Sequence, residues 1–314
     1  MVEIKNTIFD NIFTVYYYSE MPDTRAFFHI NLQDNNDFYN SLYDYFFSED
    51  KLVQYLHNKK GILFNPNRKQ YVDLFQHLQN YIDSENILDI TNYNKEVISI
   101  LKQEFPIEKQ GDKISIRQDK FGKIGEYIFC NILSYYYNFD CIIPKVHYTT
   151  NNNMSVYGID ALFYSKEHNL LLFGESKFCA NLTNGIELVN KSLKKYSEQI
   201  KEEYRLVLSG RILKTYPSIF NERFGEARDI SSTIEEFIEE ANITQIGIPI
   251  FIVHGKDIDE KNILENLRKV KQKDFFSLRT IYYFISLPVI NKENLMSCFR
   301  QKINEKLREY KNAG

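Results

Sequence analysis

The hydrophobic pattern predicts that the C-terminal two thirds of the chain alternates helices and strands. Apolar positions at helical spacing predict helices, and short apolar runs bounded by polar residues predict strands. In chain order the pattern predicts a helix at Lys120–Tyr136, a strand at Asp140–His147, a loop at Asn151–Asn153, strands at Gly158–Tyr164 and Leu170–Lys177, a helix at Gly185–Leu208, a strand at Ile246–Val253, a helix at Ile258–Lys271, a strand at Thr280–Leu287 and a helix at Asn291–Tyr310. This alternation is typical of an α/β fold.

The first hundred or so residues are predicted to form an α+β region, and they contain no chemical motif that we recognise. Strand-like runs at Ile12–Tyr18 and Arg25–Leu32 are mixed with helical patterns at Phe38–Leu56 and Gln70–Ile82. A polar stretch follows at Glu108–Asp119, and it is the best candidate for a domain boundary. We therefore predict an N-terminal region at residues 1–110 and a second domain at residues 111–314, a mixed sheet with helices on both faces.

The strand at Leu170–Lys177 carries the first candidate chemistry. An apolar run ends abruptly in Glu175, Ser176 and Lys177. Because side chains alternate faces along a strand, Glu175 and Lys177 share one face and Ser176 points to the other. The spacing therefore predicts a carboxylate and an ammonium group side by side.

A second carboxylate is expected across the hairpin. If the chain turns symmetrically about Glu167 and His168, Asp160 lies directly opposite Glu175, with Cβ atoms about 5 Å apart. Two buried carboxylates this close repel each other and need a compensating cation. A divalent metal together with Lys177 would supply it.

A third carboxylate lies in the helix that precedes the hairpin. That helix is apolar nearly all round, so a carboxylate at Glu126 is costly unless it is paired or bound to a metal. Gly125 before it allows close approach to the sheet. We therefore predict Glu126 as the third acidic ligand.

These residues define the predicted active site. The catalytic residues are Glu126, Asp160, Glu175 and Lys177, and Ser176 joins the three acids as a metal ligand. Oxygen ligands without nearby His or Cys suit Mg²⁺ or Mn²⁺. Such an ion activates water for attack on a phosphodiester, while Lys177 orients that water or stabilises the developing negative charge.

The same residues resemble the PD-(D/E)xK nucleases. The sequence has a helical Glu, then Gly158-Ile159-Asp160, then Gly174-Glu175-Ser176-Lys177, with Gly-Ile where the family pattern has Pro. The resemblance implies a restriction-endonuclease-like core.

Four segments resemble the HamA family more narrowly, the nuclease subunits of Hachiman antiphage defence systems. They are Phe121–Phe129, Tyr157–Tyr164, Leu170–Phe178 and Gly247–Phe251. This resemblance implies a DNA nuclease of little sequence preference, controlled by a superfamily 2 helicase subunit of the HamB type.

Composition narrows the remaining possibilities. The net charge of −3 gives no global attraction to nucleic acid, so DNA binding needs a local basic surface or a partner. We find neither a signal peptide nor an apolar run long enough to span a membrane, so we expect a soluble, cytoplasmic protein. The four cysteines, Cys130, Cys141, Cys179 and Cys298, have no zinc or disulfide spacing and are read as reduced core thiols.

Plainer interpretations stay open for each of these residues. Glu175 and Lys177 can form a structural salt bridge, and Glu126 can be an ordinary helix-flank carboxylate. Five bases of the predicted helix alternate with acids, which favours a solvated face over a DNA-binding one: Lys191, Lys194, Lys195, Lys201 and Arg205. Gln199 on the same helix is a weak signal for an auxiliary polar residue of the active site.

Two alternative functions also stay open. A catalytically silent subunit with a nuclease-like fold can bind DNA or regulate a helicase. Cleavage of RNA cannot be separated from cleavage of DNA, because the metal chemistry is shared.

Overall fold

A computed structural model describes most of the chain. The described residues are 2–8, 13–18, 23–28, 36–48, 51, 69, 72, 75–76, 86–94, 98, 107–118, 121–144, 161–165, 167–209, 233–255, 260–288 and 292–312. The predicted loop at Asn151–Asn153, Asp160 and Arg205's side chain lie outside what is described.

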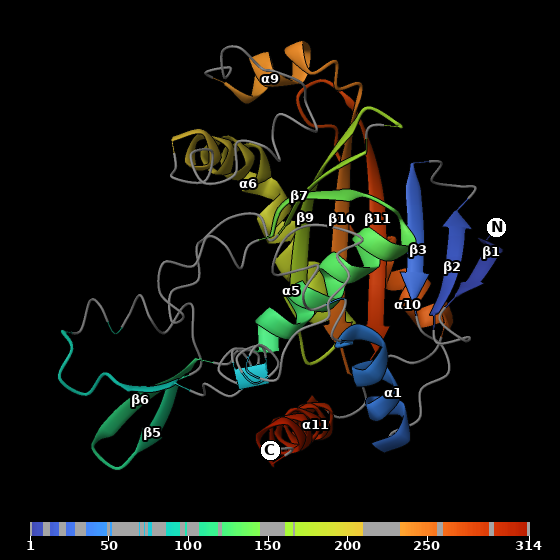
Figure 1. Cartoon of the computed structure of the whole chain (residues 1–314). Coiled ribbons are helices and arrows are strands. Elements are labelled where there is room, and N and C mark those ends of the chain that lie inside the picture. The colour runs from blue at the N-terminus through green and yellow to red at the C-terminus, as the bar shows by residue number, and fades with distance from the viewer. Residues whose placement is uncertain are drawn as a thin grey trace.

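An eight-stranded mixed sheet forms the centre of the molecule (Figure 1). Its order is β1-β2-β3-β11-β10-β9-β8-β7. The strands are β1 (Val2–Ile8), β2 (Phe13–Tyr18), β3 (Thr24–Phe28), β7 (Asp140–Pro144), β8 (Ala161–Ser165), β9 (Leu170–Phe178), β10 (Gln245–His254) and β11 (Arg279–Pro288). The four central strands, β3, β11, β10 and β9, are parallel, and the outer pairs are antiparallel.

Helices cover both faces of this sheet. They are α1 (Asn36–Phe46), α5 (Phe121–Asn131), which continues as the π-helix η1 (Ile132–Tyr136), α6 (Leu182–Ser209), α9 (Ile234–Glu240), α10 (Glu260–Leu267) and α11 (Lys292–Asn312). One apolar core joins the sheet to α1, α5 and α11, and we call that side the α5 face. A second core joins it to α6, α9 and α10 on the other side, the α6 face. The predicted mixed sheet with helices on both faces is therefore confirmed.

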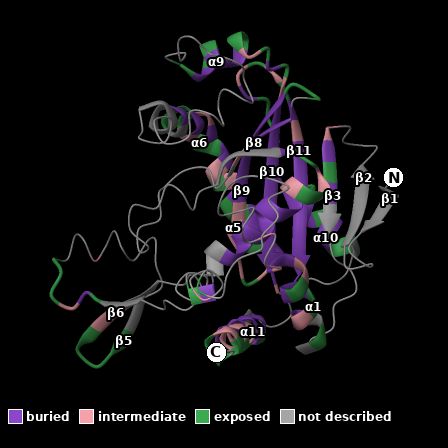
Figure 2. Ribbon diagram, in the orientation of Figure 1, coloured by how far each residue is buried: buried purple, intermediate pink, exposed green. Residues whose placement is uncertain are grey.

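Alternating burial sorts the strand residues between the two cores. Leu170 and Leu172 of β9 belong to the α5 face, whereas Leu171 and Phe173 belong to the α6 face. Most residues of β9, β10 and β11 are buried (Figure 2). Strands covered on both faces read as nearly continuous apolar runs, which is why the sequence predicts them well.

The N-terminal strands complete the same sheet. β3 pairs in parallel with β11, with Thr24 opposite Tyr282, and β1 and β2 extend the sheet outward from it. Strands from both sides of residue 110 therefore share one sheet. The division into two domains at residue 110 stays a prediction. The polar stretch predicted as a boundary is folded: it lies in a small sheet of β4 (Asn86–Asp89), β5 (Ile107–Gln110) and β6 (Lys113–Gln118). Gly111, with φ of +61°, makes the turn between β5 and β6.

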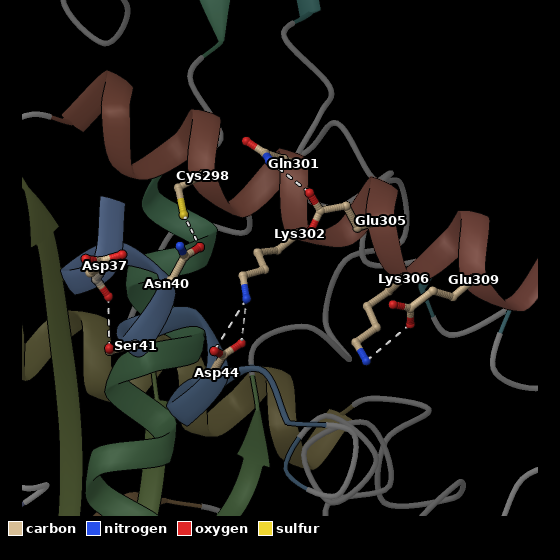
Figure 3. A network of polar contacts seen from close by, with 10 residues as sticks. All are labelled: Asp37, Asn40, Ser41, Asp44, Cys298, Gln301, Lys302, Glu305, Lys306 and Glu309. Carbon is tan, nitrogen blue, oxygen red and sulfur yellow. Dashed lines mark hydrogen bonds and ion pairs between the residues drawn. The ribbon is translucent and has the colours of Figure 1, made fainter. Parts of the chain in front are cut away.

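Polar contacts join the first described helix to the last one (Figure 3). The Lys302 Nζ of α11 lies 3.2 Å from Asp44 Oδ1 of α1, and Cys298 Sγ donates to Asn40 Oδ1 at 3.0 Å. Beneath these contacts, Phe299 packs edge-on against Tyr43. α1 and α11, the first and last described helices, therefore support each other on the α5 face.

The helix predicted at Ile258–Lys271 is shorter in the structure, because α10 ends at Leu267. The backbone tightens there, and the Lys269 and Val270 N–H groups donate to carbonyls three residues earlier.

Candidate active site

The hairpin of β8 and β9 has the register that the sequence predicts. Ser165 pairs with Leu170, and at the far end Ala161 pairs with Gly174. The turn between the strands is symmetrical about Glu167 and His168, and Asn169 takes a positive φ of 44° in it. Asp160 is the residue before Ala161 and lies outside the described residues.

Glu175 and Lys177 point to the α6 face. They pair with Ile250 and Ile252 of β10, whose side chains both belong to that core. Ser176 pairs with Phe251, which belongs to the α5 face. The predicted arrangement of Glu175 and Lys177 on one face and Ser176 on the other is therefore confirmed.

The Glu175 carboxylate is buried and held by two side chains. The residue is only 3% exposed. Its Oε1 pairs with the Lys177 ammonium and accepts a hydrogen bond from Ser192 Oγ at 2.8 Å. The Lys177 side chain is 25% exposed, whereas that of Glu175 is 4% exposed. This places a fixed carboxylate beneath an accessible ammonium group.

Ser192 is a residue that the sequence reasoning missed. It lies on α6, 17 residues after Glu175, and no motif marks it. Tyr196, one turn later, donates its hydroxyl to the Phe173 carbonyl at 2.9 Å and so fixes the helix against β9. The one sequence feature that could have pointed to Ser192 is its place as a polar residue on the helix that follows the Glu-Ser-Lys strand.

The first turn of α6 packs tightly against β10. A Cβ atom at Gly185 would lie 2.6 Å from Ile252 Cγ2, closer than real side chains allow. Ile252 is β-branched and its Cγ2 is close to the backbone, so it cannot easily move away. Gly185 therefore sets the distance of α6, and with it Ser192, from the sheet.

Glu126 lies in the helical layer on the other side of the sheet from Glu175 and Lys177. It lies on α5, which packs on the α5 face, and it is partly buried. The preceding Gly125 lies against the end of β9, where an added Cβ would sit 3.8 Å from Phe178 and 3.9 Å from Phe251. Those are ordinary contact distances, so the helix does pass close to the strand end but does not need glycine to do so.

Two more polar residues lie near the carboxyl ends of the neighbouring strands. His254 of β10 and Ser286 of β11 are buried, and His254 Nε2 lies 2.7 Å from Ser286 Oγ. Both belong to the alternate positions that face α6, as Glu175 does. Ligand sites of open parallel sheets form beyond the carboxyl ends of strands, so this edge is the expected one.

Gln199 also lies on α6, one turn beyond Tyr196. Its Oε1 is buried and makes no hydrogen bond to any described residue. In the sequence Gln199 is only a weak signal for an auxiliary polar residue, and a buried acceptor without a hydrogen bond is unusual in native proteins.

The oxygen donors of Glu175 and Glu126 suit a hard divalent cation better than a soft metal. Within the described residues, no group of three or more His, Cys, Asp or Glu side chains lies close enough to hold a metal ion. The third carboxylate that the sequence predicts is Asp160, outside that part of the chain.

Of the four cysteines predicted to be core thiols, Cys179 is only partly buried, and the burial of Cys141 is not described. Cys130, Cys179 and Cys298 are free thiols, and Cys130 and Cys298 are buried. No helix in the described ranges is both long and apolar enough to cross a membrane.

Comparison with known proteins assigns the family. No curated protein and no solved structure matches the chain. The model of the HamA family matches residues 8–303, which is nearly the whole chain and includes every strand of the site. The chain therefore belongs to the HamA family, a component of the Hachiman antiphage defence system.

Proposed function

We propose that this protein is a metal-dependent deoxyribonuclease with a PD-(D/E)xK active site at the end of β9. The observation that carries the proposal is the buried Glu175 carboxylate, held by Lys177 and Ser192 at the end of an otherwise apolar strand. Burying a charge is costly, and a purely structural position does not require it. Membership of a defence family fits an enzyme that destroys DNA.

The proposed metal ligands are Glu126, Asp160, Glu175 and an oxygen of Ser176. The register of the hairpin supports Asp160, because continuing it by one residue beyond Ala161 and Gly174 pairs Asp160 with Glu175. A bound Mg²⁺ or Mn²⁺ would neutralise the charge that grows on the phosphoryl oxygens and acidify the attacking water. The mutual repulsion of the carboxylates would then be balanced.

Lys177 has the proposed role of an electrostatic catalyst. Its ammonium group is tied to Glu175 at one side and exposed at the other, so it is oriented before substrate arrives. A preoriented charge stabilises developing negative charge without reorganising during the reaction. Ser192 acts through Glu175, by fixing the carboxylate in one orientation, and is a positioning residue.

Mg²⁺ or Mn²⁺ should raise the thermal unfolding temperature of the protein if the three acids bind it. Binding to the folded state alone stabilises by about 2.7 kcal/mol at a concentration one hundred times the Kd. We expect this shift to be lost in Asp160→Ala, measured by differential scanning fluorimetry with and without EDTA. An equal shift in wild type and Asp160→Ala would remove Asp160 from the metal site.

Ser192→Ala should lower the rate of DNA cleavage about tenfold, because a hydrogen bond to a charged group is worth about 1.5 kcal/mol or more. It should also raise the Mg²⁺ concentration needed for half-maximal rate, since the carboxylate is less well oriented. Ser192→Thr keeps the hydroxyl and should restore both values. A loss of rate in Ser192→Ala with an unchanged Mg²⁺ requirement would mean that the hydroxyl does not position a ligand.

The partner in this proposal is a superfamily 2 helicase of the HamB type. A chain of net charge −3 has little long-range attraction for DNA, and a helicase would bring the substrate to it. The alternative is a catalytically silent subunit that binds DNA or regulates the helicase. Glu175 and Lys177 weigh against it, and a lack of Mg²⁺-dependent cleavage by the chain with its helicase would favour it.

A further inference from the structure

A basic surface forms where two distant segments meet on α6. The segment after α10 contains Arg268, Lys269, Lys271 and Lys273 in six residues without an acid. The Asn190 side chain of α6 holds this segment at two points: it donates to the Lys269 carbonyl at 3.0 Å and accepts from the Lys271 N–H at 2.7 Å. The amide nitrogen and the amide oxygen of one side chain therefore both fasten the segment to the helix.

The backbone of this segment is fixed from its inner side as well. Val270 is buried, and the Gln272 side chain donates to Thr24 Oγ1 of β3 at 2.9 Å. The Lys273 N–H donates to the Tyr282 hydroxyl of β11 at 2.9 Å. Residues 270 and 272 therefore point inward, and the lysines at 269, 271 and 273 are exposed.

Three lysines of α6 continue this surface toward the candidate active site. Asn190 and Ser192 are two positions apart, about 200° around the helix, so they lie on opposite flanks. Lys191, Lys194 and Lys195 are exposed on the outward side between those flanks, and the exposed acids Glu187 and Glu198 lie one helical turn before and after them. Lys201 lies outside this group, because it pairs with Glu235 at 2.5 Å.

These bases make a band that crosses α6 from one flank to the other. We define the basic band as Lys191, Lys194, Lys195, Lys269 and Lys271. One end is fastened by Asn190, and the other lies beside Ser192, whose hydroxyl bonds Glu175. A helix with its side chains is about 10 Å wide, so the band spans roughly that distance before it reaches the carboxylate.

We infer that the basic band binds the phosphate backbone of DNA and leads it to Glu175 and Lys177. The inference rests on the proposed nuclease function and adds the surface that positions its substrate. The five lysines of the band outnumber the two acids, Glu187 and Glu198, that flank them on α6. This local excess of positive charge attracts phosphate although the whole chain is negative. Holding the backbone in place before binding reduces the entropy lost on association. Lysine contacts to phosphate carry no sequence information, which fits cleavage with little sequence preference.

The test is DNA binding by the whole chain in EDTA, where no cleavage occurs. Anisotropy of a labelled duplex is measured over a range of NaCl concentrations for wild type and for Lys191→Gln/Lys271→Gln, one change in each segment. We expect about tenfold weaker binding at moderate salt. The slope of the logarithm of the binding constant against the logarithm of the NaCl concentration should be smaller in magnitude by about two, since each lost phosphate contact removes about 0.9 from it. The control Arg308→Gln/Lys311→Gln removes two exposed charges from α11 on the opposite face and should bind as wild type does.

Equal loss in both double variants would overturn the inference, because net charge alone would explain it. The inference would also be overturned by an unchanged salt slope in Lys191→Gln/Lys271→Gln, or by a lack of salt-dependent DNA binding in wild type. Either result would favour an acidic protein surface, instead of DNA, as the ligand of the basic band. The two proposals separate in wild type, because DNA binding is measured in EDTA and cleavage is measured in Mg²⁺. Binding without Mg²⁺-dependent cleavage in wild type would reject the nuclease and keep the band.

Discussion

Glu175→Gln should lower the rate of Mg²⁺-dependent DNA cleavage on the order of 10³-fold, about 4 kcal/mol of transition-state stabilisation. The amide keeps the size of the side chain and can still accept the hydrogen bond from Ser192. It removes the negative charge that is proposed to hold the metal and that pairs with Lys177. The fold should therefore persist while the chemistry is lost, measured as the initial rate of loss of linear DNA at saturating Mg²⁺.

Glu198→Gln is the matched control for this experiment. Glu198→Gln is the same substitution as Glu175→Gln, but Glu198 lies on α6 with an exposed side chain. We expect cleavage within a factor of two of wild type, because exposed charges contribute little. A similar fall in both variants would show that the α6 surface, and not the buried carboxylate, limits the reaction.

Lys177→Met should destabilise the protein by about 3 kcal/mol in urea unfolding, because it leaves a carboxylate that is 3% exposed without its cation. Adding Glu175→Gln to this variant should recover much of that loss, since a neutral amide does not need the cation. Both the single and the double variant should be inactive. Stability and activity would then separate, as expected if the charges are there for chemistry.

The ion pair between Lys201 and Glu235 is the control for that cycle. Its side chains are 45% and 47% exposed, so Lys201→Met should cost less than about 1 kcal/mol. If Lys177→Met cost no more than Lys201→Met, the pair at Glu175 would have to be treated as an ordinary surface salt bridge. Cleavage that survived in the double variant would remove both residues from the mechanism.

Much of the fold could be predicted from the local sequence pattern. The parts that could not be predicted are those that depend on contacts between distant segments. β9, β10 and β11 are buried on both faces, so their apolar runs mark them in the sequence. The parallel pairing of β3 with β11 joins segments more than two hundred residues apart, and no local signal predicts it. The short helix α9 was missed, although its start has a capping box in which Thr233 and Glu236 each accept from the other's backbone N–H.

The candidate site divides in the same way. The register of β8 and β9 could be predicted because a short polar turn fixes a hairpin, and alternation then places Glu175 and Lys177 on one face. Ser192 could not be predicted, because its contact depends on how far α6 lies from β10 and on its rotation. Asn190 was overlooked for a similar reason: its partners at Lys269 and Lys271 belong to a segment predicted to be helical.

The most direct test of the account is degradation of plasmid and linear DNA by the purified chain with Mg²⁺, alone and with its partner helicase and ATP, beside Glu175→Ala/Lys177→Ala. The account predicts Mg²⁺-dependent loss of DNA that EDTA and the double variant both abolish. Equal loss of DNA with wild type and the double variant, or none under any of these conditions, would contradict it.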